Sequence, residues 1–210
     1  MSAAMHRLFH ALLAVAIGAA APISATAPAL DQTARSVAEL SNAGCYGITS
    51  GAIAVPGGDD PAGIDKATRL LESLGLGFGL PDQAMNGLGA PGTVLVSRAT
   101  MGSRSLGQTD LIMAFGGAQP GCRVLLLAEP SAGLADGVAA QLTEASWKAV
   151  PSMTGQRGPL ERRVFLRRDG KGTAYLMNLM TVITPFPGSR LQLFTTTTAI
   201  PAGVQLPEGF

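Results

Sequence analysis

Histidine is the first residue type to consider for chemistry, and this chain has only two, His6 and His10. Both lie in an N-terminal segment with the composition of a secretory signal peptide. If that segment is cleaved, the mature chain contains no histidine. It then cannot form a Ser-His-Asp triad, a zinc site with histidine ligands or a histidine-ligated haem.

The second group is a pair of cysteines, Cys45 and Cys122, the only two in the chain. An oxidising compartment favours a disulfide between them, and two free buried thiols are the alternative. A closed loop of about eighty residues would stabilise the fold by roughly 4 kcal/mol. The segment Asn42-Ala43-Gly44-Cys45 ends in Gly-Cys, as lipoprotein sites do, but Asn42 stands where an aliphatic residue is expected. The disulfide is therefore the prediction.

Other catalytic motifs are missing from the sequence. It has no Gly-x-Ser-x-Gly, no Cys-x-x-Cys and no phosphate loop ending in Gly-Lys-Ser or Gly-Lys-Thr. Asp59, Asp60 and Asp65 lack the spacing of an EF-hand, and Asp60 is better explained as a helix cap. We predict no metal and no cofactor. Paired carboxylates, as in glycoside cleavage, are the remaining route to a hydrolase without histidine.

Basic residues are concentrated near the C-terminal end. Residues 157–171 contain six of them, against only Glu161 and Asp169. The two-residue period of a strand places Arg163 and Arg167 on one face. A solvated arginine-rich face is the simplest interpretation. The functional one is a surface for an anionic partner, such as an acidic protein or lipid head groups, at Arg163 and Arg167.

The glycine-rich segment Gly75–Gly92 is predicted to be a long loop. Its larger apolar side chains are Phe78, Leu80, Met85 and Leu88. Long loops in compact domains are often lids or binding loops. These four residues are therefore candidates for binding a small hydrophobic ligand, and packing over one end of the core is the alternative.

The N-terminal segment predicts export. A weakly basic start, an apolar run of about ten residues and the small residues Ala27-Pro28-Ala29 form a signal peptide over 1–29. That run is shorter than the roughly twenty apolar residues a membrane span needs, and no later segment is long enough. We expect a periplasmic or secreted protein without a transmembrane span.

Composition predicts a single domain over 30–210. Only 14% of all residues are charged, and loss of Arg7 with the leader brings the net charge to zero. This balance argues against nucleic acid as a partner. The charge is uneven, with 11 acidic and 6 basic residues in 31–145 but 3 acidic and 8 basic residues in 146–210.

Helices and strands must position these residues. Periodicity and capping residues predict helices at 31–43, 61–74 and 131–145. Strands are predicted at 46–55, 93–98, 109–115, 122–128, 160–168, 173–183 and 190–199. A two-residue turn at Asp169-Gly170 is expected between the fifth and sixth of these strands.

The order of these elements repeats. Helix, strand, strand, strand covers 61–128 and again 131–200, and Pro120-Gly121-Cys122-Arg123 matches Pro187-Gly188-Ser189-Arg190 before each last strand. One such unit leaves a sheet face uncovered, so two should share a core. Coincidence between common Pro-Gly turns is the alternative. We predict an α+β fold of two tandem α-β-β-β units, with an antiparallel sheet and the helices packed on one face.

No motif identifies a reaction, so three kinds of function remain. The leading expectation is an exported, non-catalytic binding or accessory protein of the cell envelope, with an envelope protein or an anionic lipid as partner. One alternative is a carrier of small hydrophobic ligands gated by the Gly75–Gly92 loop. The other is a hydrolase with paired carboxylates and no histidine.

Overall fold

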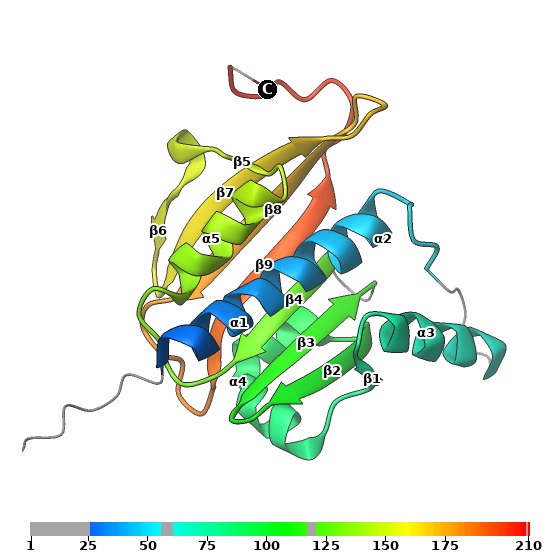
Figure 1. Ribbon diagram of the computed structural model, residues 1–210, viewed down its shortest axis with the longest axis vertical. Coiled ribbons are helices and arrows are strands. Elements are labelled where there is room, and N and C mark those ends of the chain that lie inside the picture. Colours follow the sequence, from blue (N-terminus) through cyan, green and yellow to red (C-terminus); the bar gives the residue numbers. More distant parts are fainter. Residues whose placement is uncertain (1–25, 56–60, 117–120, 209) are drawn as a thin grey trace, which may run out of the picture.

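The computed structural model describes residues 26–55, 61–116, 121–208 and 210, and a single antiparallel sheet forms its centre (Figure 1). The described strands are β1 (Gly77–Phe78), β2 (Thr100–Leu106), β3 (Thr109–Phe115), β4 (Cys122–Leu127), β5 (Lys148–Ala149), β6 (Gly155–Arg157), β7 (Leu160–Arg168), β8 (Ala174–Val182) and β9 (Leu191–Ala199). The described helices are α1 (Thr26–Glu39), α2 (Gly47–Thr49), α3 (Pro61–Ser73), α4 (Asp82–Val96) and α5 (Leu134–Glu144), with a π-helix η1 (Leu40–Tyr46) and a 3-10 turn η2 (Pro151–Met153). The fold is α+β, as predicted.

The strand order is β1-β2-β3-β4-β9-β8-β7-β5, with β6 also on β7. Every neighbouring pair is antiparallel. The central pair is β4 and β9, in which Val124 lies opposite Thr195. On both sides of this pair the strands run outward in reverse chain order. Each side ends in a two-residue strand that closely follows a helix, β1 after α3 and β5 after α5.

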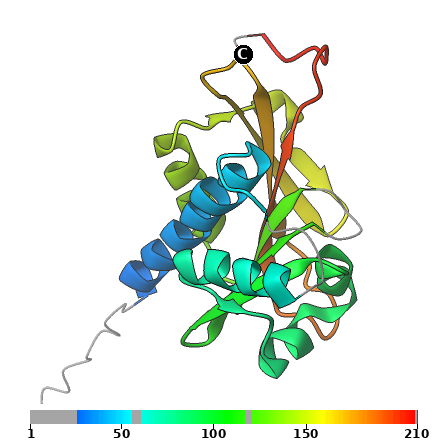
Figure 2. The ribbon, with the colours of Figure 1, turned by 90° about the vertical axis from the view of Figure 1, so that its right-hand side faces the viewer.

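Helices cover both faces of the sheet, whereas the prediction placed them on one. Neighbouring residues of β3 show the division, because Leu111 belongs to the larger core and Ile112 to the smaller one. The larger core is covered by α1, η1, α5 and Leu71 of α3. Helix α4 packs Leu88 into the smaller core on the opposite face (Figure 2).

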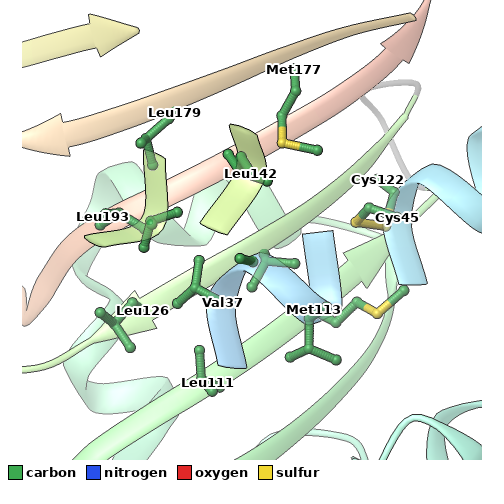
Figure 3. Packing of buried hydrophobic residues seen from close by; sticks show 14 of the residues in the cluster. Val37, Cys45, Leu111, Met113, Cys122, Leu126, Leu142, Met177, Leu179 and Leu193 are labelled. Atoms are coloured by element: carbon green, nitrogen blue, oxygen red, sulfur yellow. A yellow bond between two sulfur atoms is a disulfide. The ribbon is translucent and has the colours of Figure 1, made fainter. Parts of the chain in front are cut away.

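The larger core joins both halves of the chain (Figure 3). Val37 of α1 and Leu142 of α5 are fully buried in it together with Met113 of β3 and Leu179 of β8. Burying one such side chain contributes about 1.5–3 kcal/mol. The two sets of outer strands therefore share one interior.

The N-terminal helical segment is longer than predicted. Helices α1, η1 and α2 follow one another without a break, so Gly44 does not end a helix and 46–55 contain no strand. The helix lies close against the sheet, since a Cβ atom at Gly44 would be 3.0 Å from the Met113 side chain. Packing on the sheet has therefore overridden the local stop signal. The favoured cleavage site, 27–29, falls in the first turn of α1.

Most other elements agree with the sequence. Helices α3 and α5 and strands β3, β4, β7, β8 and β9 confirm the predicted segments within a few residues at their ends. The predicted strand 93–98 is wrong because it lies mostly in the last turn of α4, and β2 was missed. The turn after β7 has five residues, 169–173, and the two-residue turn is wrong. Residues 1–25 of the predicted signal peptide 1–29, with His6 and His10, and the predicted cap Asp60 lie outside the described residues.

Candidate functional site

Two hollows meet at the end of the sheet where β7 turns into β8. The first, of about 370 Å³, lies between Arg168 and Lys171 on one side and residues 201–204 and Leu206 near the C-terminal end on the other. The second, of about 230 Å³, lies between Lys148, Arg168 and Phe210. The first falls in the usual size range of small-molecule sites. We call this region, with Lys148, Arg168 and Lys171, the basic end.

The loop between β7 and β8, which carries Lys171, is built around Asp169. Its Oδ1 atom accepts hydrogen bonds from the backbone N–H groups of Lys171 and Thr173, both at 2.9 Å, and the Tyr175 hydroxyl donates to Oδ2 at 3.1 Å. Desolvation acts to raise the pKa of Asp169, but these hydrogen bonds and the charge of Lys171 outweigh it and lower the pKa. The oxygens of the Asp169 carboxylate therefore accept hydrogen bonds from the loop backbone and from Tyr175.

Arg168 and Lys171 are both exposed. Arg168 donates one hydrogen bond, from Nη1 to the carbonyl oxygen of Gly172 at 3.0 Å. Among the described residues, neither cation is in an ion pair within 4.0 Å of a carboxylate. A guanidinium has five N–H donors in a planar fork, which suits carboxylate and phosphate groups. The basic end therefore has the charge and the donors to hold an anion.

Arg163, one of the two predicted partner residues, lies elsewhere and is ion-paired. It donates to Asp136 of α5 at 2.6 Å and to Glu161 at 3.0 Å, and its side chain is 27% exposed. Burial alone would lower the pKa of Arg163, but these hydrogen bonds outweigh it and raise the pKa. Its charge is neutralised locally.

Arg167, the other predicted partner residue, is held by an aromatic cluster. Its guanidinium lies 4.3 Å from the centre of the Tyr46 ring and donates to Asn42 Oδ1 at 2.8 Å. The Trp147 indole N–H donates to the same oxygen at 3.1 Å. Tyr46 makes edge contacts with Trp147 and Tyr175. Trp147 is 1% exposed, and Arg167, which contacts this cluster, also lines the second hollow.

The candidate ligand residues of the Gly75–Gly92 segment do not come together in one hollow described above. Leu88 is fully buried in the smaller core and Leu80 is half-buried against it. Phe78 on β1 is 50% exposed and Met85 on α4 is 47% exposed. The expected loop is wrong, because most of the segment is helix α4.

The predicted disulfide is confirmed. Cys45 of η1 and Cys122 of β4 are bonded, with Cα atoms 5.1 Å apart. Within the described residues, no group of three or more His, Cys, Asp or Glu side chains could hold a metal ion. No helix in this part of the chain is long and apolar enough to cross a membrane.

The predicted residues Arg163 and Arg167 lie on a different face of β7 from the residue Arg168 of the basic end. Arg163 and Arg167 share the face that carries α5, whereas Arg168 lies on the alternate face beside the C-terminal residues. Lys148 lies 20 residues before Arg168, and no local sequence pattern indicated that it belongs to the basic end. Only the pairing of β5 with β7 brings it there.

Comparison with known proteins adds no assignment. No protein-family model matches the chain, and neither the curated proteins nor the solved structures gave a match. The function must therefore be argued from the basic end itself.

Proposed function

We propose that this chain is an exported, non-catalytic binding protein of the cell envelope that holds an anionic ligand at the basic end. The observation that carries the proposal is the meeting of two hollows at Arg168, with Lys171 beside one and Lys148 beside the other. Positive side chains next to partly enclosed space concentrate anions. The net charge of the mature chain is zero, so this attraction is a property of the site and not of the whole molecule.

The export part of the proposal rests on the leader and the disulfide. A disulfide forms and persists in the periplasm or outside the cell, and is rare in the cytosol. The Cys45–Cys122 bond supports that compartment. Anionic lipids and the acidic surfaces of envelope proteins are available there as partners.

Binding to anionic and zwitterionic vesicles at low and high salt tests the proposal. The double variant Arg168→Gln/Lys171→Gln should lose most of the salt-sensitive binding to anionic vesicles. The control Lys66→Gln/Arg98→Gln removes the same charge from exposed positions elsewhere and should bind as the unchanged protein does. Equal binding by all three proteins would contradict an anion site at the basic end.

We also infer that 61–128 and 131–200 are tandem copies of one α-β-β-β unit. The mirrored strand order around β4 and β9 supports this. In each unit a helix leads directly to a two-residue edge strand, and three longer strands then run inward to the centre. The units differ in their insertions, since α4 follows β1 whereas η2 and β6 follow β5.

The ends of α3 and α5 support the same inference. The Leu76 N–H donates to the Leu71 carbonyl at 2.9 Å, and the Trp147 N–H donates to the Leu142 carbonyl at 3.0 Å. Both links are the six-to-one bond of a Schellman cap. Superposing the two units in an experimental structure tests the duplication, and a poor fit of β2-β3-β4 on β7-β8-β9 would contradict it.

A further inference from the structure

The C-terminal residues lie over a small apolar cluster that is separate from the two main cores. Its buried centre is Val150, Val164 and Leu166, and the half-buried Leu206 and Phe210 are among the side chains that pack against it. We call the residues that pack over this cluster with Leu206 and Phe210 the cover. Few backbone hydrogen bonds attach it to the rest of the fold. Ile200 N–H donates to the Ala174 carbonyl at 2.8 Å, and Val204 N–H donates to Pro201 within the segment itself.

The two hollows lie on either side of this cover. The first is lined by residues 201–204 and Leu206 together with Arg168 and Lys171, and the second by Phe210 together with Lys148 and Arg168. Lys148 Nζ lies 5.4 Å from the centre of the Phe210 ring. Apolar groups from the chain's own C-terminal residues therefore lie directly beside exposed cations.

We propose that the basic end is the seat of a single-chain anionic amphiphile, with a carboxylate or phosphate head on one alkyl chain. The head would be held by Arg168 and Lys171, and the alkyl chain would lie on the Leu166 surface that Leu206 and Phe210 now cover. This names the ligand class of the proposed function and rests on it. A cover attached mainly by side chains opens at low cost, so the alkyl chain can take its place.

The anionic head group and the alkyl chain would bind different parts of the basic end. A planar guanidinium pairs with a carboxylate or phosphate through two parallel hydrogen bonds, and Arg168 has donors beyond the one bonded to Gly172. The alkyl chain is favoured because it leaves water for the apolar surface of the small cluster. Neither half of the ligand is expected to bind well by itself.

Calorimetric titration with four probes tests the proposal. The probes are dodecanoate, a single-chain phosphatidylglycerol, dodecanol and inorganic phosphate, each below the concentration at which it aggregates. The two anionic amphiphiles should bind at least about tenfold more tightly than dodecanol or phosphate. Phosphate binding as tightly as dodecanoate would show a small-anion site and overturn the proposal, and dodecanol binding equally well would also overturn it.

Variants assign the two halves of the ligand. Arg168→Gln/Lys171→Gln should weaken dodecanoate binding at least about tenfold, and Lys66→Gln/Arg98→Gln should not change it. Phe210→Ala removes the aromatic cover and should strengthen dodecanoate binding by about threefold, because less of the cover must be displaced. Unchanged or weaker binding by Phe210→Ala would overturn the displacement of the cover.

The amphiphile seat and the proposed function can fail separately. If anionic vesicles bind through Arg168 and Lys171 but neither single-chain amphiphile does, the seat is wrong and anion binding stands. If vesicles and amphiphiles bind equally to Arg168→Gln/Lys171→Gln and to the unchanged protein, both proposals are wrong.

Discussion

At the residue scale, Asp169 determines which charges the basic end presents. Its carboxylate accepts hydrogen bonds from two backbone N–H groups of the loop between β7 and β8 and from the Tyr175 hydroxyl of β8. Tyr175 is buried, and both its desolvation and its bond to Asp169 raise its pKa. Asp169 thus shapes the loop, and among the described residues it forms no ion pair with Arg168 or Lys171.

Replacing Asp169 by Asn should reduce the dependence of stability on pH in the acid range. The folded-state pKa of Asp169 is lowered from its ordinary value, so its carboxylate stabilises the fold above the unfolded-state pKa. That contribution is lost as the pH falls through the folded-state pKa. Melting temperatures of both proteins should differ most above the ordinary pKa of about 3.9 and converge as the pH falls below it and through the folded-state pKa.

Tyr175→Phe is the matched control for this prediction. It removes one of the three hydrogen bonds to Asp169 and keeps the two backbone donors, so it should retain part of the pH dependence. A gap between the Asp169→Asn and unchanged proteins that is the same at every pH would contradict a lowered pKa as the cause.

At the element scale, the C-terminal caps of α3 and α5 share one geometry with different residues. Gly75 has φ 71° and Ser146 has φ 68°, both in the left-handed region. Glycine adopts this region without steric cost, but a side chain there is strained. The cap at α5 therefore carries strain that the cap at α3 does not.

Ser146→Gly should stabilise the protein. Relief of the left-handed strain is worth about 1–2 kcal/mol, and the added freedom of glycine in the unfolded chain costs about 0.4–1 kcal/mol. The net gain in the free energy of unfolding should be about 0.5–1 kcal/mol, read from urea denaturation at equal m-value. Ser146→Ala keeps the strained φ and should give no gain. A loss of stability in Ser146→Gly would show that the Ser146 side chain makes a stabilising contact that outweighs the strain.

At the scale of the whole molecule, the disulfide fixes the N-terminal helices to the centre of the sheet. Cys45 belongs to η1, outside both proposed units, and Cys122 begins β4, one of the two central strands. The Ser41 hydroxyl of η1 shares a buried 2.7 Å hydrogen bond with Thr195 of β9. The two attachments reach both central strands, so η1 spans the junction between the units.

Removing this disulfide should weaken the whole fold. The bond closes a loop with a sequence separation of 77 residues. In the chain-entropy model, Cys45→Ala/Cys122→Ala should lower the free energy of unfolding by about 3–5 kcal/mol. Urea denaturation with and without reductant measures it. Reductant should destabilise the unchanged protein and leave the double variant unaffected, and an equal effect on both would contradict the prediction.

Local sequence patterns by themselves determined the disulfide, α3, α5 and five of the long strands. The two cysteines had no other partner to pair with. The apolar runs of β3 and β4 and the alternating residues of β7 are signals carried by neighbouring residues, so a single sequence displays them. The basic segment was visible for the same reason.

Only the tertiary structure decided the remainder. Helix α4 was missed because its glycines lower helix propensity, and the burial of Leu88 on the sheet compensates. The ion pair of Arg163 with Asp136 and the contact of Arg167 with the Tyr46 ring each join residues far apart in the chain. Whether residues of low helix propensity form a helix depends on contacts between segments distant in sequence. The same contacts decide which charged side chains remain free to bind a partner. Such contacts leave no local periodicity to read.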